Sequence, residues 1–271
     1  METHSPSIID GFKCYAPAAA LEEHDFPREG FDLLYRSEAN SFWFRGRQRL
    51  IEYLVNRFLP VRPASFLEVG CGTGFVLKGL SKLNGLDVMG AELHLEGLKW
   101  AKERMPDIEL IQLDATQLPF QECFDAIGAF DVIEHIEADE KVFGQMWSAL
   151  KCNGLLFMTV PQHPWLWSAL DDRGCHKRRY TRRELTIKLQ RAGFRIRFMN
   201  SFVTFLLPAM ALSRLLPERP SAPSQERTCE LQLPPWLDSL CELSLRCEEF
   251  LLRCGLTLPV GGSLIGVAQK C

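Results

Sequence analysis

Short apolar runs alternate with amphipathic stretches through most of the chain. Before residue 162 there are five such runs, each of a length that suits a buried strand, at 65–70, 86–92, 108–114, 124–133 and 154–161. Stretches with apolar positions three and four apart separate them, as in 96–105. This alternation is typical of βαβ units, so the pattern predicts an α/β fold with a doubly wound, mostly parallel sheet.

Two more apolar runs, 194–201 and 263–270, would supply the last strands of the sheet. Between them lies an insertion of about sixty residues. It opens with an apolar segment from Phe202 to Leu216, continues through the Pro- and Ser-rich stretch 217–226, and closes with a helix-like stretch. Because the insertion is small for an independent core, we predict that it forms a helical cap.

The beginning of the chain is polar, with three prolines in residues 1–29, and this composition predicts a loose arm. A helical pattern of apolar positions follows it. We therefore divide the chain into an N-terminal arm and lid at 1–45, a catalytic core at 46–201 and 262–271, and a helical cap at 202–261.

Glycines occupy alternate positions directly after the first predicted strand. Residues 67–74 read LEVGCGTG, which places Gly70, Gly72 and Gly74 just before a helix-like stretch. Glycines let the backbone approach a ligand closely, and a helix N-terminus offers unpaired amide groups. A dinucleotide fingerprint would need a third glycine where Phe75 stands, which argues against a dehydrogenase. The carboxylate of Glu68 would repel a pyrophosphate and favours a cationic ligand.

Acidic residues also close the next two predicted strands, at Glu92 and Asp114. A carboxylate at the end of the second strand can accept both hydroxyls of a ribose. Asp114 could receive an adenine amino group. The glycines alone could form an ordinary tight turn, but three acidic strand ends in register argue against chance. Together they indicate a positively charged adenosine without phosphates, a description that S-adenosylmethionine fits.

These motifs, ExGCGTG, Glu92, LDATQLPF and FDAIGAFDVIEHI, resemble those of the class I S-adenosylmethionine-dependent methyltransferases. The chain is similar to their small-molecule branch, which includes the ubiquinone-biosynthesis O-methyltransferases. The resemblance covers about residues 40–200 and 262–270. It implies a Rossmann-like sheet of seven strands with the last antiparallel, S-adenosylmethionine as cofactor and S-adenosylhomocysteine as product. The insertion departs from the family pattern of a tight hairpin at this place, which leaves the acceptor open.

The resemblance also implies which residues bind the cofactor. The glycine-rich turn would line the methionine end, the end of the second strand the ribose, and the end of the third strand the adenine. Phe130 and Asp131 would follow the fourth strand beside the reacting methyl group. The implied cofactor-binding residues are Glu68, Gly70, Cys71, Gly72, Gly74, Glu92, Leu93, Asp114, Ala115 and Phe130.

Three histidines are candidates for catalysis. Methyl transfer depends mainly on alignment, but an oxygen acceptor such as a phenol gains from a general base, for which histidine is suited. His135 follows the fourth strand and is the preferred candidate, while His163 and His176 lie in the loop after the fifth. Each could instead be a structural histidine. We predict no bound metal.

A metal site is the alternative for the same region. Asp131, Glu134 and His135, joined by a histidine from the next loop, could bind Mg²⁺ or Zn²⁺. This arrangement resembles metal-dependent methyltransferases that act on RNA 3′ ends or on quinone precursors.

Two segments could cover the site. The loop 162–180 carries two tryptophans and lies over the strand ends, so it would act as a lid or acceptor wall. In the stretch 42–47, Arg45 is assigned to the methionine carboxylate of the cofactor, with Arg47 as the other possible partner. Alternatively, the two tryptophans only anchor the loop to the body of the protein, and the two arginines are exposed to solvent at the start of a helix.

Charge and composition limit the remaining possibilities. The 271 residues carry 31 Lys and Arg against 34 Asp and Glu, a net charge of −3, which excludes a uniformly basic nucleic-acid binder. Residues 86–145 nevertheless have a net charge of −10, and residues 173–197 a net charge of +9. The basic block beside the apolar segment 202–216 indicates an anionic or membrane-proximal acceptor, and that segment could lie in a membrane interface. Packing within the cap is the alternative that we prefer.

The ten cysteines form no CxxC pair, and the first residues do not read as a secretory signal. No apolar run is long enough to span a membrane. We therefore expect a cytoplasmic protein, with peripheral membrane contact as a further possibility.

The leading prediction is an S-adenosylmethionine-dependent methyltransferase that acts on oxygen of a small-molecule or lipid-like acceptor. One alternative is a metal-assisted RNA or nucleic-acid ribose methyltransferase that uses the basic block to bind phosphates. The absence of an Asn/Asp-Pro-Pro-aromatic motif after the fourth strand argues against methylation of base amino groups. The other alternative is a non-catalytic S-adenosylmethionine-binding regulator.

Overall fold

The computed structural model describes residues 6–21, 28–215 and 233–271. The Pro- and Ser-rich stretch 217–226 and the last residue of the apolar segment, Leu216, lie outside these ranges. The described strands form one sheet of nine in the order β1-β2-β5-β4-β3-β6-β7-β9-β8. The strands are β1 Ser7–Ile9, β2 Phe12–Cys14, β3 Ala64–Val69, β4 Leu86–Glu92, β5 Glu109–Gln112, β6 Phe124–Phe130, β7 Leu150–Pro161, β8 Phe194–Phe202 and β9 Ser263–Lys270.

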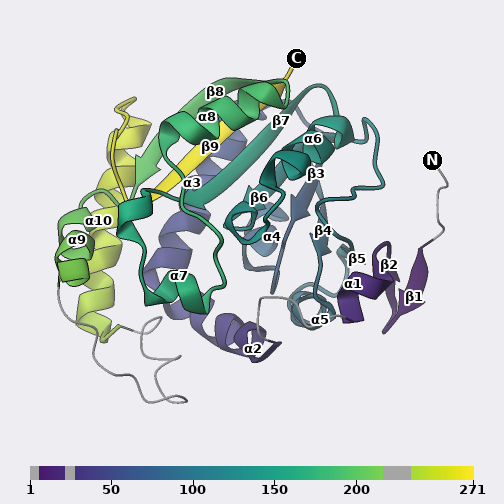
Figure 1. The fold of residues 1–271 in the computed structure, drawn as a ribbon, viewed down its shortest axis with the longest axis horizontal. Helices are drawn as coiled ribbons and strands as arrows, with labels where there is room; N and C mark the ends of the chain where they lie inside the picture. The colour runs from purple at the N-terminus through teal and green to yellow at the C-terminus, as the bar shows by residue number, and fades with distance from the viewer. Residues whose placement is uncertain (1–5, 22–27, 216–232) are drawn as a thin grey trace.

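Helices cover both faces of this sheet (Figure 1). The longer helices are α2 Arg28–Ser37, α3 Phe42–Phe58, α4 Phe75–Leu80, α5 Leu95–Arg104, α6 Asp139–Ala149, α8 Arg182–Arg191, α9 Leu207–Leu215 and α10 Pro235–Arg253. The short ones are α1 Pro17–Leu21, η1 Glu38–Asn40, η2 Ile133–His135, η3 Pro164–Leu166 and α7 Ala169–Arg173.

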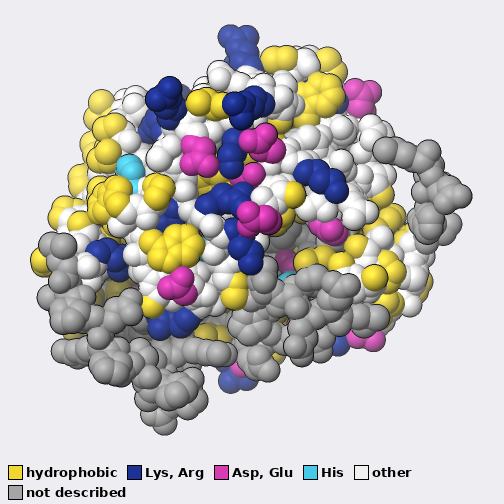
Figure 2. Space-filling view, in the orientation of Figure 1, with side chains coloured by type: hydrophobic (Ala, Val, Ile, Leu, Met, Phe, Trp, Pro, Cys, Tyr) yellow, Lys and Arg dark blue, Asp and Glu magenta, His cyan; other side chains and the backbone are white. Residues whose placement is uncertain are grey.

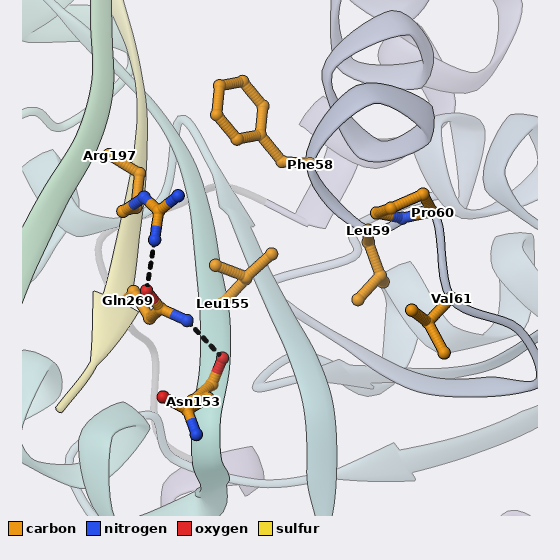
Figure 3. A pocket seen from close by; sticks show the side chains of 8 residues that line it. All are labelled: Phe58, Leu59, Pro60, Val61, Asn153, Leu155, Arg197 and Gln269. Carbon is orange, nitrogen blue, oxygen red and sulfur yellow. Dashed lines mark hydrogen bonds between the residues drawn. The ribbon is translucent and has the colours of Figure 1, made fainter.

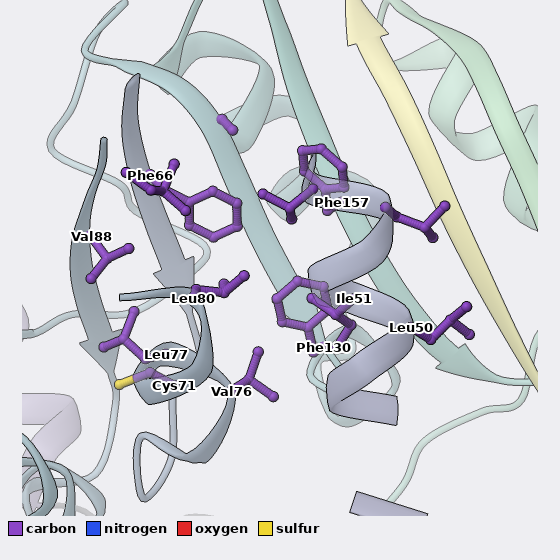
Figure 4. Packing of buried hydrophobic residues seen from close by; sticks show 14 of the residues in the cluster. Leu50, Ile51, Phe66, Cys71, Val76, Leu77, Leu80, Val88, Phe130 and Phe157 are labelled. Carbon is purple, nitrogen blue, oxygen red and sulfur yellow. The ribbon is translucent and has the colours of Figure 1, made fainter. Parts of the chain in front are cut away.

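Each face of the sheet has its own hydrophobic core, because neighbouring residues of a strand point to opposite faces. On one face Phe66 and Phe157 pack with α3 and α4, for example against Ile51 (Figure 4). On the other face Leu67 belongs to a second core, which includes Phe143 of α6. The two cores confirm the doubly wound arrangement that the alternating pattern predicts.

The central strands β5, β4, β3, β6 and β7 are parallel, whereas β9 is antiparallel to both β7 and β8. The predicted number of seven strands is wrong, because residues from the N-terminal arm add a hairpin, β1 and β2, beside β5. Phe12 and Cys14 are buried there, and the Gln112 side chain binds the backbone of Ala16 on both its amide and its carbonyl. This part of the arm is therefore ordered against the core.

The insertion before β9 contributes two described helices, α9 and α10. Helix α10 packs on α3, with Leu245 and Leu252 in the core of that face. Arg49 of α3 adds ion pairs to Glu242 at 2.6 Å and to Glu249 at 3.1 Å. Among the described helices, none is long and apolar enough to cross a membrane.

Candidate functional site

The turn after β3 takes the shape that its glycines allow. Gly70, Gly72 and Gly74 all have positive φ angles, of 70°, 52° and 75°, which residues with a Cβ rarely adopt. A Cβ on Gly70 would clash with Val132, whereas the corresponding position on Gly72 faces open space. Gly74 begins α4 and packs near Met105. The backbone of the turn is thus open to a ligand at Gly72.

Backbone amides hold the acidic residues at two strand ends, and one of these residues contacts this turn. The Glu92 carboxylate accepts hydrogen bonds from the Gly72 amide at 2.9 Å and from the amides of Leu93 and His94 at 2.9 and 3.1 Å. Asp114 accepts from both the amide and the hydroxyl of Thr116 at 2.8 Å. These bonds fix the direction of both carboxylates.

Glu68 differs from the other two acids because it is almost fully buried. Its Oε2 atom has no hydrogen-bond partner among the described residues. Burial raises the pKa of Glu68 well above its usual value, Arg47 opposes this shift, and Glu38 and Glu92 add to it. A cationic ligand beside Glu68 would therefore relieve an electrostatic penalty.

A cavity of about 1010 Å³ lies at the carboxyl ends of β3, β4 and β6. Its walls contain most of the residues that the sequence assigned to the site, namely Glu68, Gly70, Cys71, Gly72, Glu92, Leu93, Asp114, Ala115, Phe130, His135 and His176. A smaller cavity of about 180 Å³ lies at the opposite end of the strands, beside Leu59 and Asn153 (Figure 3). Arg197 and Gln269 bind each other there at 2.7 Å, and neither acids nor histidines line it. The larger cavity is the candidate site.

Three predicted residues do not line this cavity: Gly74, Arg45 and His163. Arg45 is directed to α10, where it forms ion pairs with Asp238 at 2.5 Å and Glu242 at 3.3 Å. Its assignment to the cofactor does not fit this geometry. Arg47 takes the inward position instead and pairs with Asp131.

His163 does not line the cavity, and its ring lies beside that of Trp165, tilted by 32° with the ring centroids 5.5 Å apart. Burial and, to a smaller extent, Arg179 lower its pKa. Its assignment to catalysis does not fit this position, because its side chain is not among those that line the cavity.

The other two histidines meet at the cavity wall. The rings of His135 and His176 pack edge to face, with centroids 4.7 Å apart. Nδ1 of His176 lies 2.9 Å from Asp171 Oδ1, and Arg179 contacts the same carboxylate at 2.7 and 2.9 Å. Burial alone would raise the pKa of Asp171, but the bonds from His176 and Arg179 lower it below its usual range. Asp171 therefore remains ionised and orients His176, a role that sequence spacing did not reveal.

Glu134 lies beneath this pair and is fully buried. Neither of its oxygens has a hydrogen-bond partner among the described residues, and burial followed by the nearby Asp131 raises its pKa well above the usual value. Ligand atoms of Glu134, His135 and His176 all lie within 4.8 Å of one another. This donor set, two imidazoles and one carboxylate, suits a divalent cation such as Zn²⁺.

The N-terminal helices close the cavity from the opposite side. Phe31 and Glu38 line it, and Glu38 accepts hydrogen bonds from the Thr73 hydroxyl at 2.6 Å and from Arg104 at 2.9 Å. The glycine-rich turn is thus tied to η1. No sequence pattern points to Glu38, since a single acidic residue in a polar stretch gives no periodic or motif signal.

Comparisons with known proteins agree with this geometry. Residues 67–158 match the family described as "Methyltransferase domain". The chain is 34% identical to a demethylmenaquinone methyltransferase of Renibacterium salmoninarum over 99 residues, or 36% of this chain and 41% of that protein. It is 30% identical to the mitochondrial ubiquinone biosynthesis O-methyltransferase of Rattus norvegicus over 110 residues, or 37% of this chain and 32% of that protein. Residues 67–158 therefore carry a methyltransferase domain.

A solved structure supports the fold of this methyltransferase domain. Phosphoethanolamine N-methyltransferase 2 of Haemonchus contortus, in complex with S-adenosyl-L-methionine, aligns with a TM-score of 0.59 at 16% identity. The alignment covers 90% of this chain and 57% of that one. The cofactor of the domain is S-adenosylmethionine. The chain spans less than half the length of each of the two curated relatives, and their acceptors are not thereby its own.

Proposed function

We propose that this protein transfers the methyl group of S-adenosylmethionine to an oxygen atom of a small-molecule or lipid-like acceptor. One observation carries the proposal: a single cavity joins the strand-end carboxylates to a pair of histidines. Apolar walls at Trp43, Phe44, Ile136 and Leu170 suit a hydrophobic acceptor. Similarity to quinone methyltransferases over part of the chain supports the same choice.

In the cofactor half, Glu92 would accept the ribose hydroxyls, and Asp114 with Ala115 would hold the adenine. The open backbone at Gly72 would lie along the methionine end. Arg47 is the better partner for the methionine carboxylate, since it lines the cavity, whereas Arg45 is directed to α10.

In the acceptor half, His176 would act as the general base. The Asp171 carboxylate favours the tautomer with the proton on Nδ1, which leaves Nε2 able to accept a proton. The acceptor hydroxyl gives its proton to Nε2 as its oxygen attacks the methyl carbon. Bound S-adenosylmethionine would supply the methyl group, and its carbon–sulfur bond would break as the carbon–oxygen bond forms, leaving the electron pair on the neutral thioether sulfur of S-adenosylhomocysteine. His135, packed against His176, would fix the position of the ring.

A metal-assisted reaction is the second candidate, because Glu134, His135 and His176 form a compact donor set. A bound divalent cation would polarise the acceptor oxygen. Calorimetric titration with Mg²⁺ and with Zn²⁺, on the native protein and on Glu134→Gln, separates the two candidates. Binding that Glu134→Gln abolishes, together with a metal-dependent rate, would replace the general-base mechanism. If neither metal binding nor a metal-dependent rate is observed, a metal has no part in the reaction.

We propose a reducing compartment, the cytoplasm, for this activity. Ten cysteines without a CxxC pair support it.

We also propose the division of the chain into an N-terminal arm and lid at 1–45, a catalytic core at 46–201 and 262–271, and a helical cap at 202–261. The hydrogen bond between Glu38 of η1 and Thr73 of the core supports a lid role for the last residues of the N-terminal arm.

The substitution Glu92→Ala tests the cofactor half. Loss of charge-assisted hydrogen bonds to the ribose is expected to raise the Kd for S-adenosylmethionine roughly tenfold to a hundredfold in a calorimetric titration. Glu96→Ala, on the exposed start of α5, is the matched control and should leave the Kd unchanged. An unchanged Kd for Glu92→Ala would contradict the ribose assignment.

The acceptor is identified by incubating the protein with labelled S-adenosylmethionine and fractionated cell extract, followed by mass analysis of the labelled product. A labelled small apolar molecule supports the proposal. Label in RNA would support a nucleic-acid methyltransferase instead. Tight cofactor binding without any labelled product would favour a non-catalytic regulator.

A further inference from the structure

The first turns of helix α3 bring three side chains to the candidate site. Trp43, Phe44 and Arg47 all line the large cavity. They lie three and four positions apart, which places them on one side of the helix. The direction in which this side faces therefore depends on what holds the beginning of α3.

Arg47 is the charged member of this set, and part of its guanidinium group is unused. It pairs with Asp131, just after β6, and its guanidinium carbon lies 4.5 Å from the centre of the Trp43 ring. The Nε atom of Arg47 is buried and has no hydrogen-bond partner among the described residues. Because a buried donor without a partner is costly, this atom favours an anionic group of a ligand in the cavity.

The first turn of α3 is capped by a residue of the insertion. Ser41 stands at the N-cap position of α3, but its side chain makes no capping hydrogen bond. Instead, the Asp238 carboxylate of α10 accepts a hydrogen bond from the Phe42 amide at 2.7 Å. A carboxylate at this place satisfies a free amide and interacts favourably with the positive end of the helix dipole. Asp238 thus takes over the capping role.

The same carboxylate also fixes the rotation of α3 about its axis. Asp238 pairs with Arg45 at 2.5 Å. Residues two positions apart on a helix are about 200° apart around its axis, so Arg45 and Arg47 face nearly opposite directions. An Arg45 side chain held by α10 therefore leaves Arg47 directed to the cavity.

Further contacts hold the two helices close together. A Cβ on Gly46 would lie only 2.4 Å from Leu245 Cδ1, so α10 packs directly on the backbone of α3 there. One turn later, Arg49 pairs with Glu242 and Glu249 at 2.6 and 3.1 Å. Helix α10 is therefore a firm support for the beginning of α3.

The acids of α10 that make these ion pairs are turned away from solvent. Asp238, Glu242 and Glu249 are only 13%, 11% and 14% exposed. Figure 1 shows α10 at one end of the molecule, and Figure 2 shows hydrophobic side chains along the same edge. The negative charge of these acids is thus directed at the arginines of α3.

We propose that Asp238 of the insertion is a positioning residue for the cofactor. By capping and orienting α3, it holds Arg47 where the free Nε donor meets the methionine carboxylate of S-adenosylmethionine. The arrangement is static, because α10 supports α3 and need not move when the cofactor binds. The inference rests on the proposed function in one respect, which is the assignment of Arg47 to that carboxylate.

Calorimetric titration of the full chain with two ligands tests the inference. S-adenosylmethionine carries the carboxylate, and decarboxylated S-adenosylmethionine lacks only that group. The ratio of their Kd values measures the preference for the carboxylate. Asp238→Ala should raise the Kd for S-adenosylmethionine about tenfold and leave the Kd for the decarboxylated ligand unchanged. A purely structural role would change both Kd values by the same factor.

A conservative variant separates the two contacts of Asp238. Asp238→Asn keeps an oxygen for the Phe42 amide but loses the charge that holds Arg45. We expect it to raise the Kd for S-adenosylmethionine alone, by about threefold. This variant carries the test if Asp238→Ala does not fold, which circular dichroism and thermal unfolding verify.

Two other residues of α10 provide matched controls. Ser239→Ala changes the next position, whose hydroxyl donates to the Pro235 carbonyl of the same helix at 2.8 Å, and should leave both Kd values unchanged. Glu249→Ala removes an ion pair to Arg49, which lies beyond the first turn of α3. It should lower the Tm and keep the preference for the carboxylate.

Arg47→Gln distinguishes a failure of the inference from a failure of the proposed function. It should raise the Kd for S-adenosylmethionine roughly tenfold to a hundredfold and abolish the preference. If Arg47→Gln keeps the preference, the assignment of Arg47 is wrong and the inference falls with it. If only the Asp238 variants keep it, the inference alone is overturned. Equal rises of both Kd values in Asp238→Ala would also overturn it and would assign Asp238 to the stability of the fold.

Discussion

At the scale of single residues, the buried Glu68 carboxyl group, which we propose lies beside the cofactor, carries a cost in stability. This group has a raised pKa, so the folded chain keeps its proton at a pH where the unfolded chain has lost it. The free energy of unfolding therefore falls as the pH rises above about 4.3, the ordinary value for glutamate, until the folded pKa is passed.

Glu68→Gln removes this titration. The variant should match the native protein near pH 4 and become more stable than it at higher pH, by about 1.4 kcal/mol for each unit between the two pKa values. Urea unfolding of the ligand-free protein from pH 4 to pH 8 measures the difference. Glu122→Gln, at a side chain that is 67% exposed, should show no comparable gain with rising pH. A Glu68 variant less stable than the native chain at pH 8 would disprove the argument.

His176 is the residue on which the proposed chemistry depends most. Its replacement in His176→Gln should slow methyl transfer about 10²- to 10⁴-fold, because a positioned general base contributes that much. The Kd for S-adenosylmethionine should stay the same, which calorimetry can verify. His163→Gln, outside the cavity, should retain the native rate. If His163→Gln slows methyl transfer as much as His176→Gln does, His176 is not the general base.

The two arginines of α3 show where residue-level prediction ends. Residues two positions apart on a helix are about 200° apart around its axis, so Arg45 and Arg47 must face different neighbours. The sequence shows this separation but not which side meets the cavity. That is decided by α10, whose Asp238 and Glu242 lie about 200 positions later and engage Arg45.

At the scale of elements, the two opposed charge blocks of the sequence meet across α6 and α8. Asp139 at the start of α6 accepts from Lys188 at 2.5 Å, from the Tyr180 hydroxyl at 2.7 Å and from Arg178 at 3.1 Å. Burial would raise the pKa of Asp139, but these bonds lower it. Much of the basic block therefore stabilises the fold instead of facing an anionic partner.

Asp139→Asn should destabilise the protein by about 3 kcal/mol, because it leaves buried cationic and hydroxyl partners without their charge. Chemical denaturation at pH 7 provides the measurement. Glu140→Gln, the neighbouring but half-exposed acid that lies 3.7 Å from Arg191, is the control and should cost less than about 1 kcal/mol. If both variants lose the same free energy of unfolding, the buried contacts of Asp139 stabilise the fold no more than a surface ion pair does.

The elements also differ in how well the sequence reveals them. The predicted runs 86–92 and 263–270 coincide with β4 and β9, because buried strands must be almost continuously apolar. The hairpin of β1 and β2 could not be predicted. Its strands have only three residues each, and Phe12 and Cys14 find their apolar neighbours nearly one hundred positions away, at β5.

At the scale of the whole molecule, the cavity is assembled from parts that are far apart in the sequence. Its walls combine Phe31 and Glu38 from the N-terminal part, the strand ends of the core, and Leu170 from α7. The family motifs cover only the strand ends, so the sequence could point to the residues that line the cavity there. The acceptor half depends on contacts such as Asp171 with His176, which arise only when the loops fold over the sheet.

This assembly predicts a specific pattern of protection upon cofactor binding. S-adenosylmethionine at about one hundred times its Kd should add about 2.7 kcal/mol to the stability of the folded state. Amide exchange followed by mass spectrometry should slow most in residues 28–47 and 68–75, because both segments line the cavity and are tied together by Glu38 and Thr73. Peptides from α10 supply the internal reference. Closure of the N-terminal helices over the cavity should not slow their amide exchange by more than the global gain in stability does. If residues 68–75 are protected and 28–47 are not, the cofactor binds to the core alone and the N-terminal helices are not its lid.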